Sequence, residues 1–435
     1  MNSRTTAVPV PATPPAARRG APPPPGWGAR SRWAGPAGAG LALLAGILAL
    51  SGCTGPEASP GSVPPLTGSP TSPSGTTPSG PAGGSGPGSG GASVPAGLPA
   101  GGPVPAGFTV TSITRVAGGV TYALGSAPCT ARPCTSVVRS TDGGRTWRGV
   151  PAPRVPLPAA PESRDPGTGA VRELRFATAR DGWAFGGGLW STHDGAASWR
   201  KVDAGGSVLD LATDGTTAYA LVATCPPDGS SCGGTRLLSA AATGDAFRTV
   251  AGVSLPATGY GTVSVGAAGA VVSVSGGTYV APKGGGWHRA DPRCPDAPAA
   301  EVLAAAGDAA VVAFCGGVAA GSSYFTVRRS ADGGRTWTTV PGRAVQVPNG
   351  LLTFTAASSD VLAIASASRD LRGGLKVSGD GGRTWSAASL PATPAGWRYV
   401  GASGARTLVA LAEPAQPAYW TSGDGGRTWS RTAVR

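Results

Sequence analysis

Cysteine is the residue type of this 435-residue chain whose spacing points most directly to chemistry. Six of its seven cysteines fall in three close pairs, and Cys53 stands apart from them. The pairs are Cys129 with Cys134, Cys225 with Cys232, and Cys294 with Cys315. Thiols clustered in this way either form disulfides or bind zinc.

A zinc site is the weaker interpretation of these cysteines. The chain contains no Cys-x-x-Cys, and His193 and His288 are its two histidines, whereas structural zinc sites usually combine such spacings. An even set of cysteines in an exported chain indicates disulfides, although six cysteines permit fifteen pairings. We predict the pairing of sequence neighbours, because it closes three small loops.

The N-terminal segment indicates export. Residues 1–52 contain five arginines and no acidic residue, and an apolar stretch, AGPAGAGLALLAGILAL, runs from Ala34 to Leu50. A basic region followed by a short apolar region is typical of a signal peptide. The stretch is short and broken by glycine for a membrane-spanning helix. An uncleaved N-terminal anchor is the alternative.

The letters LSGC at Leu50 to Cys53 resemble the lipobox of bacterial lipoproteins. This resemblance implies that residues 1–52 are removed and that Cys53 is diacylated, which leaves the rest of the chain outside the cytoplasm on the cell membrane. Residues 53–107 consist mainly of Gly, Pro, Ser and Thr and cannot bury a core. We therefore predict a disordered tether ahead of a domain at residues 108–435.

The net charge of +13 does not by itself indicate a nucleic-acid partner. Residues 1–52 carry part of this charge. Four further arginines lie in four separate copies of a repeated eight-residue phrase, so they are dispersed along the chain. They are Arg145, Arg335, Arg383 and Arg427. Because binding to a phosphate backbone needs a continuous basic patch, we expect no nucleic-acid partner.

A phrase of eight residues that ends in tryptophan recurs along the chain. The clean copies, STDGGRTW, SADGGRTW and twice SGDGGRTW, begin at Ser140, Ser330, Ser378 and Ser422. A worn copy, STHDGAASW, ends at Trp199, and vestiges end at Phe247 and Trp287. The terminal aromatic residues are 40 to 52 residues apart, which divides the chain into seven units.

Each unit contains short β-rich runs separated by turn residues. One unit reads VRELRFAT, ARDG, WAFGG, LWST, HDGAA and SWRKV. Four strands in a repeat of this length are typical of a propeller blade, and no run shows sustained helical periodicity. We therefore predict an all-β fold, a seven-bladed β-propeller.

The phrase S-x-D-G-G-x-T-W resembles the Asp-box, or BNR repeat, of sialidases, sortilin-type receptors and photosystem II assembly-factor-like propellers. The resemblance implies a hairpin between strands 3 and 4 of each blade. Aspartate accepts hydrogen bonds from turn amides, Gly-Gly supplies positive φ, and tryptophan packs against a neighbouring blade. We expect structural and not catalytic roles for Asp142, Trp147, Asp194, Trp199, Asp332, Trp337, Asp380, Trp385, Asp424 and Trp429.

Strand parity predicts which connections share a face of the propeller. The 1–2 and 3–4 connections open on one face, and the longer 2–3 and 4–1 connections, with all predicted disulfides, open on the other. Elaborated loops usually carry function, so we expect ligand binding there; the alternative is that the disulfides only protect an exported fold. The candidates are Arg154, Glu162, Arg164 and Asp165 in the 151–170 loop, and Arg172, Glu173, Arg175, Asp210, Tyr260, Glu301, Arg398 and Tyr399 at the channel mouth.

The likeness to sialidases implies three arginines that bind a substrate carboxylate, a tyrosine nucleophile with a glutamate, and an aspartate acid/base. The first arginine of such enzymes lies in a Phe/Tyr-Arg-Ile-Pro motif, where this chain has ITRV around Arg115. We therefore predict no catalytic residue, no cofactor and no metal. The expected function is binding of, or scaffolding for, a protein partner or a cell-wall glycan. A sialidase-like exo-glycosidase is the alternative.

Overall fold

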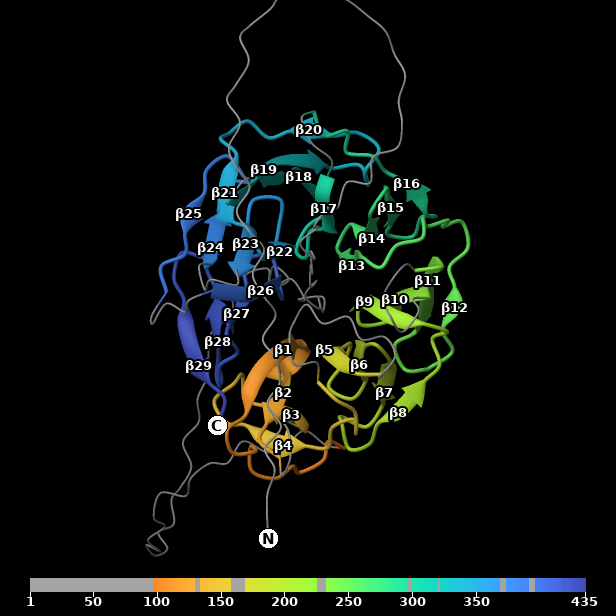
Figure 1. Ribbon diagram of the computed structural model, residues 1–435, viewed down its shortest axis with the longest axis vertical. Coiled ribbons are helices and arrows are strands. Elements are labelled where there is room, and N and C mark those ends of the chain that lie inside the picture. The colour runs from red at the N-terminus through yellow and green to blue at the C-terminus, as the bar shows by residue number, and fades with distance from the viewer. Residues whose placement is uncertain are drawn as a thin grey trace, which may run out of the picture. The chain divides into compact units, whose positions relative to one another are not determined.

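The computed structural model describes residues 97–129, 134–157, 169–224, 232–295, 299–319, 321–367, 373–390 and 396–435. In these residues the chain is all-β and forms a seven-bladed propeller, as the sequence predicts (Figure 1). Cys53, the signal peptide, most of the predicted tether, Glu162, Arg164, Asp165 and Cys225 lie outside the described residues.

Each blade is a sheet of consecutive antiparallel strands, with the first strand nearest the centre (Figure 1). Blade 1 contains β1 (Thr109–Arg115), β2 (Thr121–Ala127), β3 (Cys134–Ser140) and β4 (Arg148–Val150). Blade 2 contains β5 (Val171–Phe176), β6 (Gly182–Gly186), β7 (Leu189–Thr192) and β8 (Arg200–Val202). Blade 3 contains β9 (Ser207–Thr213), β10 (Thr217–Thr224), β11 (Gly234–Ala241) and β12 (Arg248–Thr249).

The remaining blades follow in chain order. Blade 4 contains β13 (Gly261–Gly266), β14 (Gly269–Val274), β15 (Gly277–Pro282) and β16 (His288–Arg289). Blade 5 contains β17 (Ala299–Ala304), β18 (Val311–Ala319), β19 (Ser322–Ser330), β20 (Thr338–Thr339) and β21 (Val345–Pro348). Blade 6 contains β22 (Leu351–Ala356), β23 (Leu362–Ala367), β24 (Gly373–Ser378) and β25 (Ser386–Ala387). Blade 7 contains β26 (Gly396–Ala402), β27 (Leu408–Glu413), β28 (Ala418–Ser422) and β29 (Ser430–Ala433).

Strand β21 is an element that the repeat pattern does not predict. It pairs with the first half of β19, at Ser322 to Phe325, while β20 pairs with the other end of the same strand. Its sequence, VQVP, lies in the connection between blades 5 and 6, outside the four β-rich runs that each unit repeats. A short strand of this kind at a sheet edge can end in proline, which has no amide to donate.

The hydrophobic core lies between the blades. In the described part of the chain the buried apolar residues form seven clusters, and each cluster consists mainly of side chains from two neighbouring blades. One of them joins Trp183 and Phe185 of blade 2 to Leu211 and Val222 of blade 3. We call the contact between two neighbouring blades a seam. Burial of apolar side chains between the facing sheets thus stabilises the ring at each seam.

In the described part of the chain the ring closes without an exchanged strand, because blades 1 and 7 each take their four strands from one continuous stretch of sequence. Trp147 of blade 1 packs edge-on against Tyr419 of blade 7, with ring centroids 5.9 Å apart. The Val110 amide donates to the Gln416 carbonyl at 2.9 Å. Packing and this bond join the first blade to the last.

Residues 97–107, which the sequence assigns to the tether, include a segment attached to blade 1. Gly102 and Gly149 exchange two backbone hydrogen bonds at 2.8 and 2.9 Å. A Cβ at Gly149 would lie 2.6 Å from the Pro103 carbonyl oxygen, so the close approach requires glycine there. The domain thus begins before residue 108.

Helical structure in the described part of the chain is limited to one short 3-10 turn, η1 (Ala117–Gly119), between β1 and β2. No helix in that part of the chain has the length and apolar character needed to cross a membrane.

Candidate functional site

The repeated phrase forms a hairpin turn between the third and fourth strands of its blade. We call these segments the repeat turns: residues 140–147, 192–199, 330–337, 378–385 and 422–429. In the first, Asp142 accepts hydrogen bonds from the Arg145 and Thr146 amides, both at 2.9 Å, and from the Thr146 hydroxyl at 2.6 Å. The Trp147 Nε1 donates to the Gly144 carbonyl at 3.1 Å. The aspartate thus satisfies the turn's own donors.

The repeat turns and the 1–2 turns lie on one end of the propeller, which we call the turn face. The Gly143 amide donates to Gly119 of the 1–2 turn in blade 1, at 3.1 Å. Blades 2, 6 and 7 have the same bond, at 2.9, 2.8 and 2.9 Å. Because successive strands are antiparallel, the 2–3 and 4–1 connections open on the opposite end, the loop face.

Blade 2 carries a worn repeat turn that keeps the backbone of the clean copies. Where they have a second glycine with positive φ, this turn has Ala196 at φ 67°. The Ala196 amide still donates to the Thr192 hydroxyl, at 3.0 Å. A left-handed alanine is strained, so surrounding contacts hold the turn in the repeat conformation.

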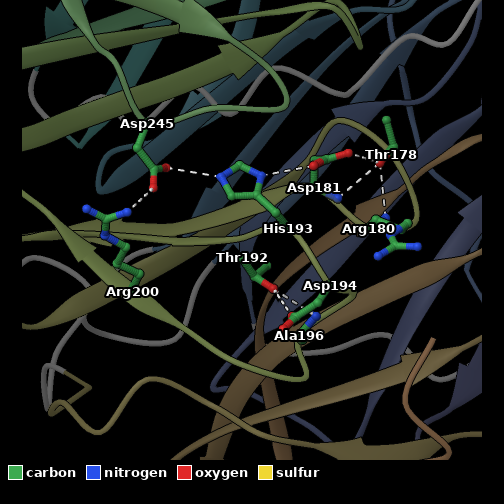
Figure 2. A network of polar contacts seen from close by, with 9 residues as sticks. All are labelled: Thr178, Arg180, Asp181, Thr192, His193, Asp194, Ala196, Arg200 and Asp245. Atoms are coloured by element: carbon green, nitrogen blue, oxygen red, sulfur yellow. Dashed lines mark hydrogen bonds and ion pairs between the residues drawn. The ribbon is translucent and has the colours of Figure 1, made fainter. Parts of the chain in front are cut away.

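His193 of this worn turn lies at the centre of a polar network on the turn face (Figure 2). Its Nδ1 lies 2.9 Å from Oδ1 of Asp181, in the 1–2 turn of blade 2, and its Nε2 lies 3.2 Å from Oδ1 of Asp245 in blade 3. The other carboxylate oxygen of Asp245 lies 4.0 Å from Arg200. The imidazole therefore bridges two carboxylates across the seam between blades.

The two carboxylates control the charge of His193. Partial burial lowers the pKa of this imidazole, but the hydrogen bonds to Asp181 and Asp245 and their negative charges outweigh burial and raise it. Sequence reasoning missed this network. The available signal was the variable second position of the repeat, which holds histidine only in blade 2.

Three residues expected at the channel mouth are buried acids inside the ring. Glu173, Asp210 and Glu301 lie on the innermost strands of blades 2, 3 and 5 and are 5%, 2% and 3% exposed. Each follows a shift in strand register, and the same irregularity precedes Ser112 and Tyr399. A β-bulge redirects the side chain, which explains why these acids are not solvated rim residues.

Side chains on the innermost strands tie neighbouring blades together. In several seams a side-chain oxygen accepts a hydrogen bond from a backbone amide on the innermost strand of the next blade. The pairs are Ser112 with Leu174, Asp210 with Val263, Ser264 with Ala304, and Thr353 with Val400, at 2.8 to 3.1 Å. The Asp210 carboxylate therefore accepts the same kind of hydrogen bond between blades that serine and threonine hydroxyls accept in the other three pairs.

The surroundings of the buried acids favour their protonated, neutral form. Burial raises the pKa of Glu173, although the ion pair with Arg175 at 3.5 Å opposes the effect. Burial and the charge of Glu173 raise the pKa of Asp210. Burial also raises the pKa of Glu301, to about 8, and its Oε1 accepts a hydrogen bond from the Thr262 hydroxyl.

The other predicted site residues are spread over different surroundings. Arg172 and Arg398 are partly exposed, and the Arg398 Nε lies 3.1 Å from the Glu413 carboxylate. Tyr399 is 4% exposed and packs in the core cluster between blades 7 and 1. Tyr260 is partly buried. Within the described ranges no three His, Cys, Asp or Glu side chains meet as a metal site.

Two of the three predicted disulfides are confirmed, and both lie toward the loop face. Cys129–Cys134 closes the 2–3 connection of blade 1, with the Cα atoms 5.7 Å apart. Cys294–Cys315 links the connection after blade 4 to β18, with the Cα atoms 5.5 Å apart. Cys315 lies in the middle of β18, which runs from Val311 to Ala319.

A cavity of about 430 Å³ lies beside the first disulfide. Its walls come from the start of β3, including Cys134 and Thr135, and from residues 152–156 after β4. The Thr135 hydroxyl donates to the Val155 carbonyl and fixes that segment against β3. Arg154 is exposed at this cavity, which places one predicted ligand residue at a concave site.

No protein-family model matches the chain, and no curated protein is similar to it in sequence. Among solved structures, YCF48 from Cyanidioschyzon merolae is similar with a TM-score of 0.46 and 14% identity, over 71% of this chain and 94% of its own. The GH74 enzyme of Niastella koreensis gives a TM-score of 0.39 and 14% identity, over 75% of this chain and 66% of its own. A mutant α-L-arabinofuranosidase from Fusarium graminearum, in complex with an iminosugar inhibitor, gives a TM-score of 0.36 and 12% identity, over 76% of this chain and 93% of its own. This likeness concerns the fold and not an activity.

Proposed function

We propose that the chain is a membrane-anchored, extracytoplasmic β-propeller that acts as a non-catalytic binding or scaffold protein for a protein partner or a cell-wall glycan. In this proposal Cys53 carries the lipid and the repeat turns are Asp-boxes. The order of basic region, apolar region and LSGC supports the anchor. The hydrogen bonds of Asp142 to its own turn support a structural box.

One observation carries the binding role: the loop-face cavity beside Arg154. The disulfide at Cys134 holds the wall formed by β3, and the bond from Thr135 to the Val155 carbonyl holds the second wall against it. Walls fixed before binding reduce the entropy lost when a ligand is ordered. An exposed guanidinium at such a cavity can bind a carboxylate or phosphate on that ligand.

The glycosidase alternative receives less support from the channel residues. An acid/base or nucleophile must reach the substrate, yet Glu173, Asp210 and Glu301 are buried and engaged in bonds between or within blades. Arg398 is paired with Glu413. These groups hold the ring together, which leaves recognition to the loops.

The experiment compares two sites on the full chain. One variant replaces residues 151–170 by a Gly-Ser turn, and a second carries the single change Arg154→Glu. We expect both variants to bind more weakly than the unaltered chain, as measured by co-sedimentation with purified cell walls or by cross-linking to a membrane partner. The matched control is Arg383→Glu on the turn face, which should bind as the unaltered chain does. Turnover of a fluorogenic sialoside is measured in parallel.

Two results would overturn the proposal. One is loss of binding only in Arg383→Glu, because recognition would then use the turn face. The other is sialoside turnover that disappears when Glu173 or Glu301 is changed to Gln without a fall in melting temperature, because the channel would then be an active site.

A further inference from the structure

A basic pocket separate from the loop-face cavity lies on the outside of the ring, between blades 4 and 5. It has a volume of about 730 Å³. Its floor and walls come from the end strand β16, the segment after it, β19 and the repeat turn of blade 5. The charged groups that line it are Arg289, Arg293, Arg328, Arg335 and Asp291, beside His288 and Trp337.

The charge of the pocket is strongly one-sided, with four guanidinium groups and one carboxylate. In the described part of the chain, none of these four arginines forms an ion pair with an acidic side chain. Asp291 is the acidic residue that lines the pocket, and its Oδ1 accepts a hydrogen bond from the Arg293 amide at 2.8 Å. Like charges gathered in a concave surface attract an anion more strongly than the same charges spread out.

Backbone bonds hold the pocket in place. Arg328 donates to the carbonyls of Pro292 and Arg293 and, at 2.8 Å, to the Trp337 carbonyl. The next residue of the same segment, Cys294, is bonded to Cys315. The segment that presents Arg293 is therefore fixed at both the guanidinium of Arg328 and the disulfide.

Donors remain for a ligand after these bonds. Arg289 and Arg335 each use one terminal nitrogen on a backbone carbonyl, of Gly276 at 3.2 Å and Asp332 at 3.0 Å. A guanidinium has five N–H donors, so both exposed arginines keep donors that can face solvent or an anion.

We propose that this pocket binds a phosphate-bearing ligand. Planar guanidinium groups bind phosphate oxygens through two parallel hydrogen bonds, and several of them around one cavity favour a ligand with more than one negative charge. The proposal does not depend on the loop-face function, because the two pockets share no residue. The phosphate could be free, on a polymer, or in a lipid headgroup, and the test separates these sources.

The probe is inorganic pyrophosphate, titrated calorimetrically into the full chain, with citrate as a carboxylate probe of similar charge. We expect pyrophosphate to bind more tightly than citrate. Arg289→Gln with Arg335→Gln should weaken pyrophosphate binding by about ten-fold or more, because bonds to charged groups are lost. The melting temperature should stay unchanged, since both side chains are exposed.

The chain supplies a matched control in Arg383→Gln. Arg383 occupies the same position of the repeat in blade 6, and its terminal nitrogen donates to the Asp380 carbonyl at 2.9 Å, as Arg335 does to Asp332. An equal loss in this control would overturn the proposal, because binding would reflect general surface charge. Absence of pyrophosphate binding at millimolar concentration, or tighter binding of citrate, would also overturn it.

Vesicles identify the source of the phosphate. Co-sedimentation with phosphatidylglycerol vesicles is compared between the unaltered chain and the double variant, so that any lipid anchor contributes equally to both. A difference supports a headgroup ligand. Equal sedimentation together with variant-sensitive pyrophosphate binding supports a soluble or polymeric phosphate.

Discussion

Asp142 and Asp210 show how the surroundings of one side chain decide its chemistry. Asp142 lies on a turn, where burial pushes its pKa up but bonds from Thr146 and Ser140 outweigh this effect and lower the pKa to about 2. Asp210 lies inside the ring, where burial and the charge of Glu173 raise its pKa. Environment and not residue type therefore separates a turn acid that is charged at neutral pH from a buried acid whose neutral form is favoured.

Removal of the turn acid should cost stability without affecting binding. We expect Asp142→Ala to lower the free energy of unfolding by about 1 kcal/mol, since water reaches the exposed turn amides and compensates part of the loss. Asp142→Asn should lose less, because it keeps one acceptor. Urea unfolding of both variants measures the difference; loss of ligand binding at unchanged stability would instead give this aspartate a functional role.

The same turn predicts a response to acid. Because the folded pKa of Asp142 lies below its ordinary value of 3.8, its stabilising effect is complete above that value and is lost as pH falls toward 2. The stability difference between the unaltered chain and Asp142→Ala should therefore shrink over this range. A difference that stays constant down to pH 2 would contradict the link.

His193 predicts the opposite pH dependence. Its pKa is raised in the folded chain, so its stabilising effect is complete below the ordinary value of 6.5 and is lost as pH rises through the folded value. The destabilisation caused by His193→Gln should therefore be larger at acidic than at alkaline pH. Thermal or denaturant unfolding at both pH values measures the difference, and an equal destabilisation at acidic and alkaline pH would contradict this role of the imidazole.

Local chemistry was predictable at the scale of single residues, and contacts across seams were not. The repeat turn follows from sequence because Asp142 and its donors lie within four residues. The burial of Glu173 depends on a register shift after Val171, which alternation of polar and apolar residues does not reveal. The His193 network joins residues 52 positions apart, beyond the range of any local pattern.

Strand order was predictable at the scale of elements because every blade repeats one hairpin grammar. The exceptions lie in connections: β21 and the segment around Gly102 both add to a sheet edge outside that grammar. Pairing at a sheet edge requires only unpaired backbone N–H and C=O groups. Because side chains do not determine it, the pattern of residue types does not predict it. The pairing of the two observed disulfides was predictable for a related reason, since short loops bring sequence neighbours together.

The two confirmed disulfides should differ in their effect on stability. Cys294 and Cys315 are 21 residues apart and Cys129 and Cys134 are 5 apart. A longer closed loop restricts the unfolded chain more, which gives about 3 kcal/mol for the first and about 2 kcal/mol for the second. Denaturant unfolding of the paired Cys→Ala variants measures the order; a larger loss in the short loop would show that native contacts, and not loop length, dominate.

The predicted lipid anchor matters at the scale of the whole molecule. We expect Cys53→Ala to abolish lipid attachment and to release the chain from membranes or leave it unprocessed. Fractionation and metabolic labelling with a fatty acid measure the two effects. Normal processing with full membrane retention would show that the N-terminal segment anchors the chain in another way.

The seam between blades 1 and 7 has a consequence for how such a chain can change over generations. Since no strand is shared across this seam among the residues that the structure describes, a stretch of coding sequence that spans one unit encodes one complete blade, and its duplication or loss leaves the strand pairing of every other sheet intact. The clean copies of the phrase belong to blades 5, 6, 7 and 1, and the worn ones to blades 2, 3 and 4. The clean copies are therefore neighbours around the ring, although blades 2, 3 and 4 separate the copy in blade 1 from the other three along the chain.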